Sequence, residues 1–471
     1  MLSLLALLLV AVFGFPITLL IAPRVRFLER LALAYGLGWG AVTLGMFYLS
    51  VLGIPFSLPN IAALLVVVTL SLGWLVRKTA DVSSYLAAAS APRDLLRRMK
   101  RPSLPETVVL SAIVFCLLAA LLIAAYWPVH TWDALAVYDV RARMFADALS
   151  IKEASLQMPH VPPLTSLAHS WLYLLGGEGQ NARLIYPLFS ASLVVVFYYS
   201  LREQCSALCS LIFALLLVTA PQFLYFSSVA YSNMPYAFYQ ATAVLCLYRW
   251  LSLHKQGYLA LSALLFGLGS WTRPATEPYL IAILAVLAVY CLGKRRCIAV
   301  AGFVALFLTV AIPWELYVRY GLSRAQVFGS LESEASIAYG LIRTGLNWVQ
   351  IGKAFDLVRL AWNLALGLIW PFFLGAVLLN LKNLKQHGWL LLIIASQAAV
   401  FVAGVCGFAT VIYPDNPRGL YAVVTSSGTR LLLFLVPLLL YYAAITKPVK
   451  DLFEVGLSVV AQIRLPADRQ P

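Results

Sequence analysis

The sequence predicts an all-α polytopic membrane protein with about 13 transmembrane helices. Hydrophobic residues make up 62% of the 471 residues, charged residues only 11%, and the mean hydropathy is +0.87. A soluble chain is about half apolar and a quarter charged. Charge-free runs long enough to cross a bilayer also recur along the chain. These observations exclude a water-soluble enzyme, a disordered chain and a nucleic-acid binder, although the net charge is +15.

The charge-free runs give the predicted spans in order. Residues 1–23 form the first, because the first charge is Arg24 and neither a basic n-region nor a cleavage motif marks a signal peptide. The stretch 31–76 contains a proline-rich turn at 53–60 and therefore supplies two spans. The remaining predicted spans are 106–126, 184–201, 207–226, 233–248, 258–272, 278–293, 297–315, 360–380, 389–411 and 431–446.

The basic residues predict the orientation. One set of loops holds 22 of the 34 Lys and Arg residues: 24–30, 77–101, 202–203, 249–255, 294–296, 382–387 and the tail 447–471. The positive-inside rule makes this set cytoplasmic, with the N-terminus outside and the C-terminus inside. We therefore expect a multi-pass protein of the plasma (inner) membrane. The three long segments 127–182, 319–358 and 412–430 then lie on the extracytoplasmic side.

The first long loop, 127–182, concentrates polar residues. Apolar residues at helical spacing predict an amphipathic helix at 133–149, lying along the membrane interface. Pro162 and Pro163 suit the start of a second juxtamembrane helix. Its apolar side chains are expected to face the bilayer: Leu164, Leu167, Ala168, Trp171, Leu172 and Leu175.

Two groups of charged residues in this loop have alternative interpretations. Asp133 follows directly after a span, where partial desolvation raises a carboxyl pKa towards the value that a general base needs. It equally suits the N-cap of the helix 134–149. Asp139, Arg143 and Asp147 stand four residues apart, and a solvated salt-bridge ladder is the simpler interpretation.

Five short motifs follow one another in the segment 106–330. They are Trp132-Asp133-Ala134 with Tyr138, His160-Val161-Pro162-Pro163-Leu164, Gly176-Gly177-Glu178-Gly179 with Arg183, Tyr231-Ser232-Asn233-Met234-Pro235, and Thr272-Arg273-Pro274. In this order the segment resembles the membrane-embedded glycosyltransferases of the C superfamily, which include the protein O-mannosyltransferases and the aminoarabinose transferases. One departure is Asn233, which stands where the family usually has an acid.

The resemblance implies transfer of a sugar from a polyprenyl-phosphate-linked donor to an acceptor hydroxyl outside the membrane. The acceptor would be a lipid, a glycan or a protein, and Asp133 matches the position of the family's loop acid. Arg273 matches the family's basic position for the donor phosphate, although a snorkelling arginine would look the same. The other candidate residues are Arg183, Arg141 and His160 for the phosphate, and Asp139, Tyr138 and Asn233 for substrate contacts; a loop hydrogen bond is the simpler role for His160.

No metal requirement and no cofactor are predicted, because Asp133 is followed by Ala134 and the next acid is Asp139. Beyond donor and acceptor, membrane lipids are the expected partners. The chain is expected to divide into a three-span extension (1–105), a glycosyltransferase-like module (106–330) and a C-terminal part (331–471).

A polytopic transporter or a flippase for lipid-linked glycans is the main alternative, and a scaffold for envelope-polysaccharide assembly is another. Transporters tend to carry ionisable residues in mid-membrane and paired broken helices. The predicted spans are nearly free of charge, and polar residues gather in one external loop. This distribution favours an enzyme with its site at the membrane surface.

Overall fold

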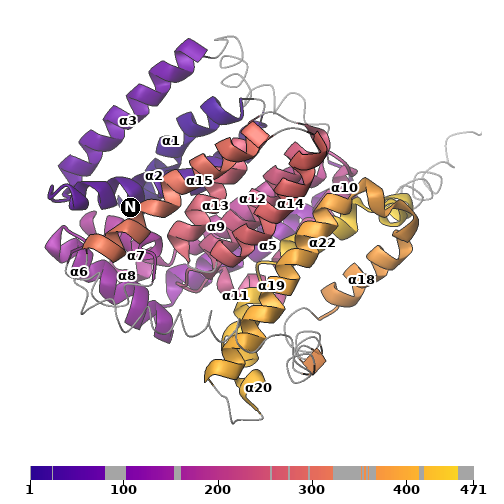
Figure 1. Cartoon of the computed structure of the whole chain (residues 1–471). Helices are drawn as coiled ribbons and strands as arrows, with labels where there is room; N and C mark the ends of the chain where they lie inside the picture. The colour runs from indigo at the N-terminus through magenta and orange to yellow at the C-terminus, as the bar shows by residue number, and fades with distance from the viewer. Residues whose placement is uncertain are drawn as a thin grey trace, which may run out of the picture.

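A computed structural model describes residues 2–23, 25–79, 102–152, 161–254, 257–273, 276–294, 297–321, 367–412 and 418–453, with the single positions 352, 355, 356 and 359. Every regular element within these ranges is a helix, and none is a strand. Long helices lie side by side and are joined by short turns (Figure 1). The predicted all-α class is confirmed for this part of the chain.

Several helices are long and apolar enough to cross a membrane. Six qualify within the described residues, and a seventh if the bent pair 430–445 and 447–453, which meets at 68°, counts as one span. Five further apolar helices have 10–17 residues. These findings support a helical membrane protein, while the number of 13 spans stays a prediction.

Each predicted span contains a helix. In chain order they are α1 (Leu2–Ile21), α2 (Phe27–Val51), α3 (Leu58–Thr79), α5 (Leu104–Tyr126), α9 (Ile185–Leu201), α10 (Ala207–Thr219), α12 (Asn233–Leu253), α13 (Tyr258–Thr272), α14 (Thr276–Lys294), α15 (Cys297–Leu316), α18 (Ile369–Leu379), α19 (Gly388–Ile412) and α22 (Val436–Ile445). The run 207–226 differs, because it breaks at Ala220 and continues as α11 (Pro221–Phe226). Pro221 has no N–H to continue α10 but suits the first turn of a new helix.

Helices α1 and α2 cross at very short range. A Cβ added to Gly14 would lie 1.9 Å from the carbonyl oxygen of Ala34, and one added to Gly38 would lie 1.9 Å from that of Val10. Only glycine fits at these two positions. Small residues at a helix crossing allow this backbone approach and are typical of membrane helix pairs.

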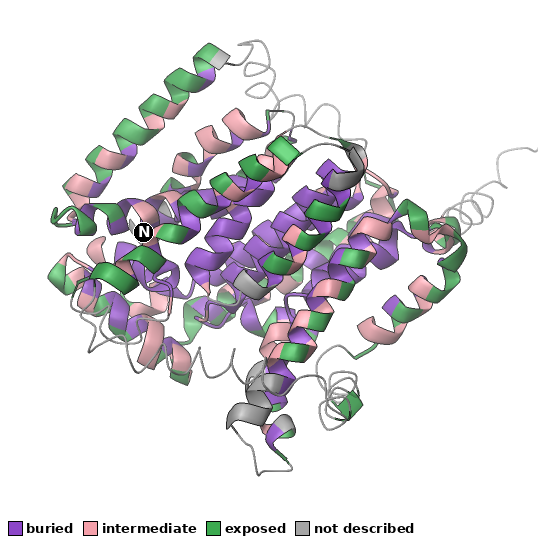
Figure 2. Ribbon diagram, viewed as in Figure 1, coloured by how far each residue is buried: buried purple, intermediate pink, exposed green. Residues whose placement is uncertain are grey.

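The interior is built from α2, α9, α12 and α13, which pack on one another and are largely buried (Figure 2). Side-chain hydrogen bonds tie α2 to the others. Tyr35 donates to the carbonyl of Ile185 at 3.1 Å, Tyr239 to that of Gly36 at 2.8 Å, and Trp271 Nε1 to Thr43 Oγ1 at 3.0 Å. The N-terminal segment 1–105 therefore contributes a central helix to the fold.

Helices α3 and α5 expose most of their apolar side chains, and Figure 2 shows α3 at the edge of the molecule. In each helix, only 17% of the most apolar stretch of 18 residues is buried inside the protein. All backbone hydrogen bonds of a helix are internal, so an apolar exposed helix is suited to contact with lipid. These two helices are the clearest lipid-facing surfaces of the described chain.

The segment 127–182 departs from the predicted arrangement. The single helix expected at 133–149 is a π-helical turn, η1 (Ala134–Asp139), followed by α6 (Val140–Ala148). It ends where Leu149 adopts a left-handed conformation with φ of 50°. The backbone N–H of Phe56 then donates to the carbonyl of Leu149 at 3.0 Å, which fastens this segment to the turn between α2 and α3.

The second predicted juxtamembrane helix is α7 (Leu164–Leu174), and its expected exposure to the bilayer is wrong. Every residue from Leu164 to Leu172 is buried inside the protein. The helix packs against α6 and α2. Its apolar face therefore covers protein, because α6 folds over the side that was expected to meet lipid.

Candidate functional site

Three of the sequence motifs meet at one place. We call this group the Asp133 cluster; its members are Asp133, Tyr138, Tyr231, Ser232, Asn233, Tyr236, Arg273, Arg430 and Phe434. It joins the start of η1, the N-terminus of α12, the C-terminus of α13 and the segment that leads from α21 (Thr429–Leu432) into α22.

Asp133 immediately precedes η1 but does not cap it. Its side chain makes no capping hydrogen bond; instead Oδ2 accepts a hydrogen bond from Arg430 Nη1 in an ion pair. The Asp133 side chain is 34% exposed and that of Arg430 is 21% exposed. The N-cap interpretation is therefore wrong, and Asp133 is an accessible carboxylate held by one arginine.

Arg430 also contacts the motif at 231–235. Its guanidinium lies 5.6 Å from the centroid of the Tyr231 ring, a distance suited to a cation–π contact. Arg430 thereby connects Asp133 and Tyr231, which lie almost 300 and almost 200 positions earlier in the chain. It was not among the residues predicted for the site.

A pair of hydroxyl groups joins the motif at 132–138 directly to the motif at 231–235. Tyr138 Oη and Ser232 Oγ are 2.7 Å apart, and either group can be the donor. The next residue, Asn233, is buried at the start of α12, and its amide nitrogen has no hydrogen-bond partner in the structure. A buried amide donor of this kind is available to a ligand that reaches the helix terminus.

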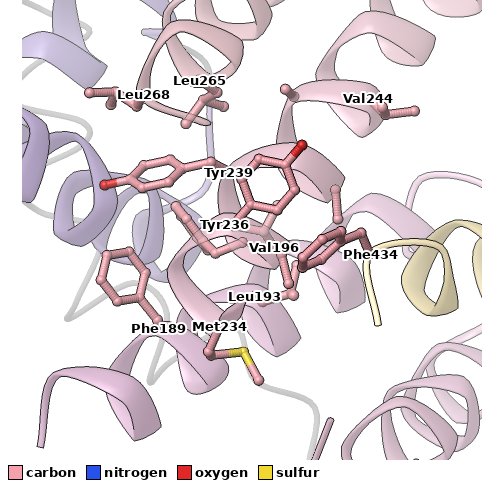
Figure 3. Close-up of a cluster of buried hydrophobic side chains, with 14 of the residues drawn as sticks. Phe189, Leu193, Val196, Met234, Tyr236, Tyr239, Val244, Leu265, Leu268 and Phe434 are labelled. Atoms are coloured by element: carbon pink, nitrogen blue, oxygen red, sulfur yellow. The ribbon is translucent and has the colours of Figure 1, made fainter. Parts of the chain in front are cut away.

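Phe434 contacts the motif at 272–274. The Arg273 guanidinium lies 5.8 Å from the centroid of the Phe434 ring, at the C-terminal end of α13. Phe434 also packs edge-on against Tyr236 of α12, with 4.4 Å between the ring centroids. Figure 3 shows these two side chains. Phe434 follows Arg430 by four residues, so one short segment contacts all three motifs.

Arg183 makes several contacts with backbone carbonyls. It is buried at the start of α9, and its guanidinium donates to three carbonyls: Ser228 at 2.6 and 3.0 Å, Trp127 at 2.6 Å and Pro128 at 2.7 Å. Each guanidinium nitrogen already has an acceptor. These hydrogen bonds hold the loops at residues 127–128 and 228 together. The predicted phosphate contact of Arg183 stays a prediction.

Asp139 belongs to a second group with Arg143, His169, Tyr173 and Tyr186; Asp139, His169 and Tyr186 are buried, whereas the Arg143 side chain is 61% exposed. The Asp139 carboxylate accepts hydrogen bonds from Arg143 Nε at 3.0 Å and from the Tyr173 hydroxyl, and its side chain is 5% exposed. Burial, followed by the hydrogen bond to Asp139, raises the pKa of Tyr173. The i,i+4 ion pair of the predicted ladder forms between Arg143 and Asp139, but its Asp139 end is buried and not solvated. The substrate contact of Asp139 stays a prediction.

His169 is the neutral member of this second group. Its Nε2 lies 2.7 Å from the Tyr186 hydroxyl, and Nδ1 lies 3.9 Å from Asp139 Oδ1. Burial lowers the pKa of His169 to about 4, although the nearby Asp139 carboxylate opposes this shift. At neutral pH the imidazole is uncharged, so Asp139 is balanced by Arg143.

Arg141 is buried without a carboxylate of its own. Nη1 donates to the carbonyl of Val161 at 3.0 Å, whereas Nε and Nη2 have no hydrogen-bond partner in the structure. Burial lowers the pKa of the Arg141 guanidinium to about 10. Its predicted phosphate contact stays a prediction. His160, most of the segment 319–358 and residues 413–417 lie outside the described residues.

A third polar group lies at the opposite ends of the helices. Arg249, near the C-terminal end of α12, forms an ion pair with Glu29 in the first turn of α2. Its Nε also lies 3.4 Å from Glu203 Oε2, in the turn between α9 and α10. We call these three residues the Arg249 triad. These buried ions lie near helix ends or in a turn, and not in the middle of a predicted span.

Within the described ranges, no three His, Cys, Asp or Glu side chains come close enough together to hold a metal ion. The prediction that no metal is required stays a prediction.

The Asp133 cluster thus contains the groups that an acid–base transfer reaction at a lipid surface needs. It offers an accessible carboxylate, two partly exposed arginines and aromatic rings beside them. Comparisons with known proteins give no further guide, since no family model, no curated protein and no solved structure matches the chain.

Proposed function

We propose that this chain is a membrane glycosyltransferase that moves a sugar from a polyprenyl-phosphate-linked donor to an acceptor hydroxyl, with Asp133 as general base. The observation that carries the proposal is the meeting of three separated motifs around residues 430–434. Asp133, Arg273 and Tyr231 are far apart in sequence, yet each contacts Arg430 or Phe434. The resemblance to the C-superfamily glycosyltransferases supports the same chemistry.

The proposed reaction is a single displacement. The acceptor oxygen attacks the anomeric carbon while its proton passes to Asp133, and the bond from that carbon to the phosphate oxygen breaks. The bonding electrons leave with polyprenyl phosphate, whose negative charge is stabilised by arginine. One attack from one face inverts the anomeric configuration. Asn233 is neutral and places no second carboxylate beside Asp133 for a covalent intermediate.

A sugar-transfer assay with purified protein in lipid tests the role of Asp133. Asp133→Asn should lower turnover roughly 10²–10⁴-fold, the usual worth of general-base assistance, because the amide cannot accept the proton. The matched control is Asp147→Asn, which removes an exposed carboxylate of the same segment that lies outside both groups. Retained anomeric configuration, or full activity of Asp133→Asn, would contradict the mechanism. Movement of an intact lipid-linked glycan across vesicles without transfer would favour a flippase.

We further propose that the Asp133 cluster faces the extracytoplasmic side of the plasma (inner) membrane, with the N-terminus outside and the C-terminus in the cytoplasm. The support is the distribution of basic residues among the loops. In a Cys297→Ser background, Trp132→Cys should react with an impermeant thiol reagent added to intact cells, whereas Lys78→Cys should not. The native residues at both positions are exposed. Labelling of Lys78→Cys alone would invert the orientation.

A further inference from the structure

We propose that Arg430 binds the donor phosphate, and that its ion pair with Asp133 is exchanged for this contact when the donor arrives. The inference rests on the proposed glycosyl transfer and names a donor-binding residue that no sequence motif indicates. It follows from the position of Arg430 between Asp133 and Tyr231.

The location of Arg430 suits a lipid phosphate. It lies in α21, just before α22 and the predicted last span, and its side chain is 21% exposed. A guanidinium at a span terminus is near the depth of lipid phosphates, and its planar set of N–H donors matches two phosphate oxygens. The Tyr231 ring beside it provides an aromatic face that orients the cation.

The other arginines near the cluster differ from Arg430. Arg183 is occupied by carbonyls, as described above, and Arg141 is almost completely buried. Arg273 is partly exposed and lies against Phe434. Arg430 alone among these four residues contacts the proposed base. It is therefore the cation through which donor binding can act on Asp133.

The exchange has a direct chemical consequence. While Arg430 Nη1 donates to Asp133 Oδ2, the ion pair stabilises the carboxylate and disfavours transfer of the acceptor's proton to it. A donor phosphodiester carries one negative charge and competes with Asp133 for the same guanidinium. Once Arg430 moves to the phosphate, the Asp133 carboxylate loses this stabilisation and accepts the acceptor's proton more readily. The same arginine then stabilises the phosphate that leaves with the bonding electrons.

A binding experiment separates this exchange from a structural ion pair. The probe is polyprenyl monophosphate, titrated into the purified protein in zwitterionic nanodiscs. Arg430→Ala should weaken binding roughly 10- to 150-fold, the worth of a charge-assisted contact, and Arg430→Lys should restore part of it. Asp133→Asn should tighten binding roughly two- to fivefold, since a partly exposed ion pair no longer competes. In the Arg430→Ala background, Asp133→Asn should have no effect.

Several controls define the ligand. Arg77→Ala removes an exposed arginine at the end of α3 and should leave binding unchanged. Three further probes each lack one feature of polyprenyl phosphate: polyprenol lacks the phosphate, inorganic phosphate lacks the lipid chain, and phosphatidylglycerol lacks the polyprenyl chain. We expect each of them to bind more weakly. Equal binding of all the phosphate-containing probes would overturn the assignment to the donor lipid.

Two results would overturn the exchange itself: wild-type affinity in a folded Arg430→Ala protein, or weaker binding in Asp133→Asn. If Arg430→Ala fails to fold, Arg430→Lys and Asp133→Asn still decide the question. The sugar-transfer assay distinguishes this inference from the proposed function. Transfer by the wild-type protein combined with unchanged binding by Arg430→Ala refutes only the role of Arg430. Absence of transfer with every polyprenyl-phosphate-linked sugar tested refutes the proposed function.

Discussion

Two of the arginine–carboxylate groups in the described part of the chain, one towards each end of the helices, differ in burial. In the Arg249 triad, the side chains of Arg249 and Glu29 are 1% and 3% exposed. In the Asp133 cluster, Arg430 and Asp133 are 21% and 34% exposed. The triad surrounds one cation with two carboxylates, whereas Arg430 contacts a single carboxylate among the described acids.

This difference separates a structural ion group from one that can take part in chemistry. A buried charge that loses its partner keeps the full cost of desolvation, so the Arg249 triad holds α2, α12 and the α9–α10 turn in one arrangement. A partly exposed pair contributes little to stability, since water and salt replace either partner. The Asp133–Arg430 pair is therefore suited to open and close at small cost.

The largest expected difference between the two groups is in stability. Arg249→Met should lower the free energy of unfolding by about 3–5 kcal/mol, because it leaves Glu29 buried without a counter-ion. The matched change Arg430→Met should cost at most about 1 kcal/mol. Thermal and denaturant unfolding in detergent measure both effects. Equal destabilisation by the two variants would remove the distinction drawn here.

The next effect concerns donor affinity. Arg273→Ala should weaken binding of the polyprenyl-phosphate donor by about 1.5–3 kcal/mol, the worth of a hydrogen bond to a charged group. Arg273→Lys should recover part of this, because lysine keeps the charge but loses the paired N–H geometry. Titration in nanodiscs measures the affinity. Normal donor affinity in a folded Arg273→Ala protein would remove Arg273 from the donor site.

The smallest effect is a dependence of stability on pH. The pKa of buried His169 is about 4, below the value of about 6.5 expected in the unfolded chain. The unfolded chain therefore binds a proton first as the pH falls below 6.5, and His169 destabilises the fold by about 2 kcal/mol at pH 5. His169→Gln should reduce the stability loss between pH 7 and 5, whereas exposed His130→Gln should not. An unchanged loss in His169→Gln would show that other groups cause it.

Much of the helical framework follows from the sequence, because bilayer thickness sets the length of a charge-free run. The interruptions were harder to predict. Pro221 breaks the run 207–226 within its apolar residues, where charge counting detects nothing. The burial of α7 was missed for a related reason: an apolar helix face looks the same whether it meets lipid or another helix.

The sequence identified several residues of the Asp133 cluster, while their roles stay predictions. Asp133, Tyr138, Asn233 and Arg273 do belong to one cluster, and the resemblance in motif order located them. Arg430 was missed because an arginine at the edge of an apolar run is indistinguishable from one that snorkels to the membrane surface. The carbonyl contacts of Arg183 were missed because backbone acceptors leave no mark in a sequence.

The central position of α2 has a consequence for how the protein is made. This helix is synthesised early, yet Tyr35, Gly36 and Thr43 bond to residues that follow 150, 203 and 228 positions later. Its mean hydropathy of 1.3 is the lowest of the six candidate spans, although 78% of its apolar window ends up buried. During insertion, its polar side chains must face lipid or an assembly factor until α13 arrives. Ribosomes stalled before residue 272 should therefore display an unfinished bundle that proteases recognise.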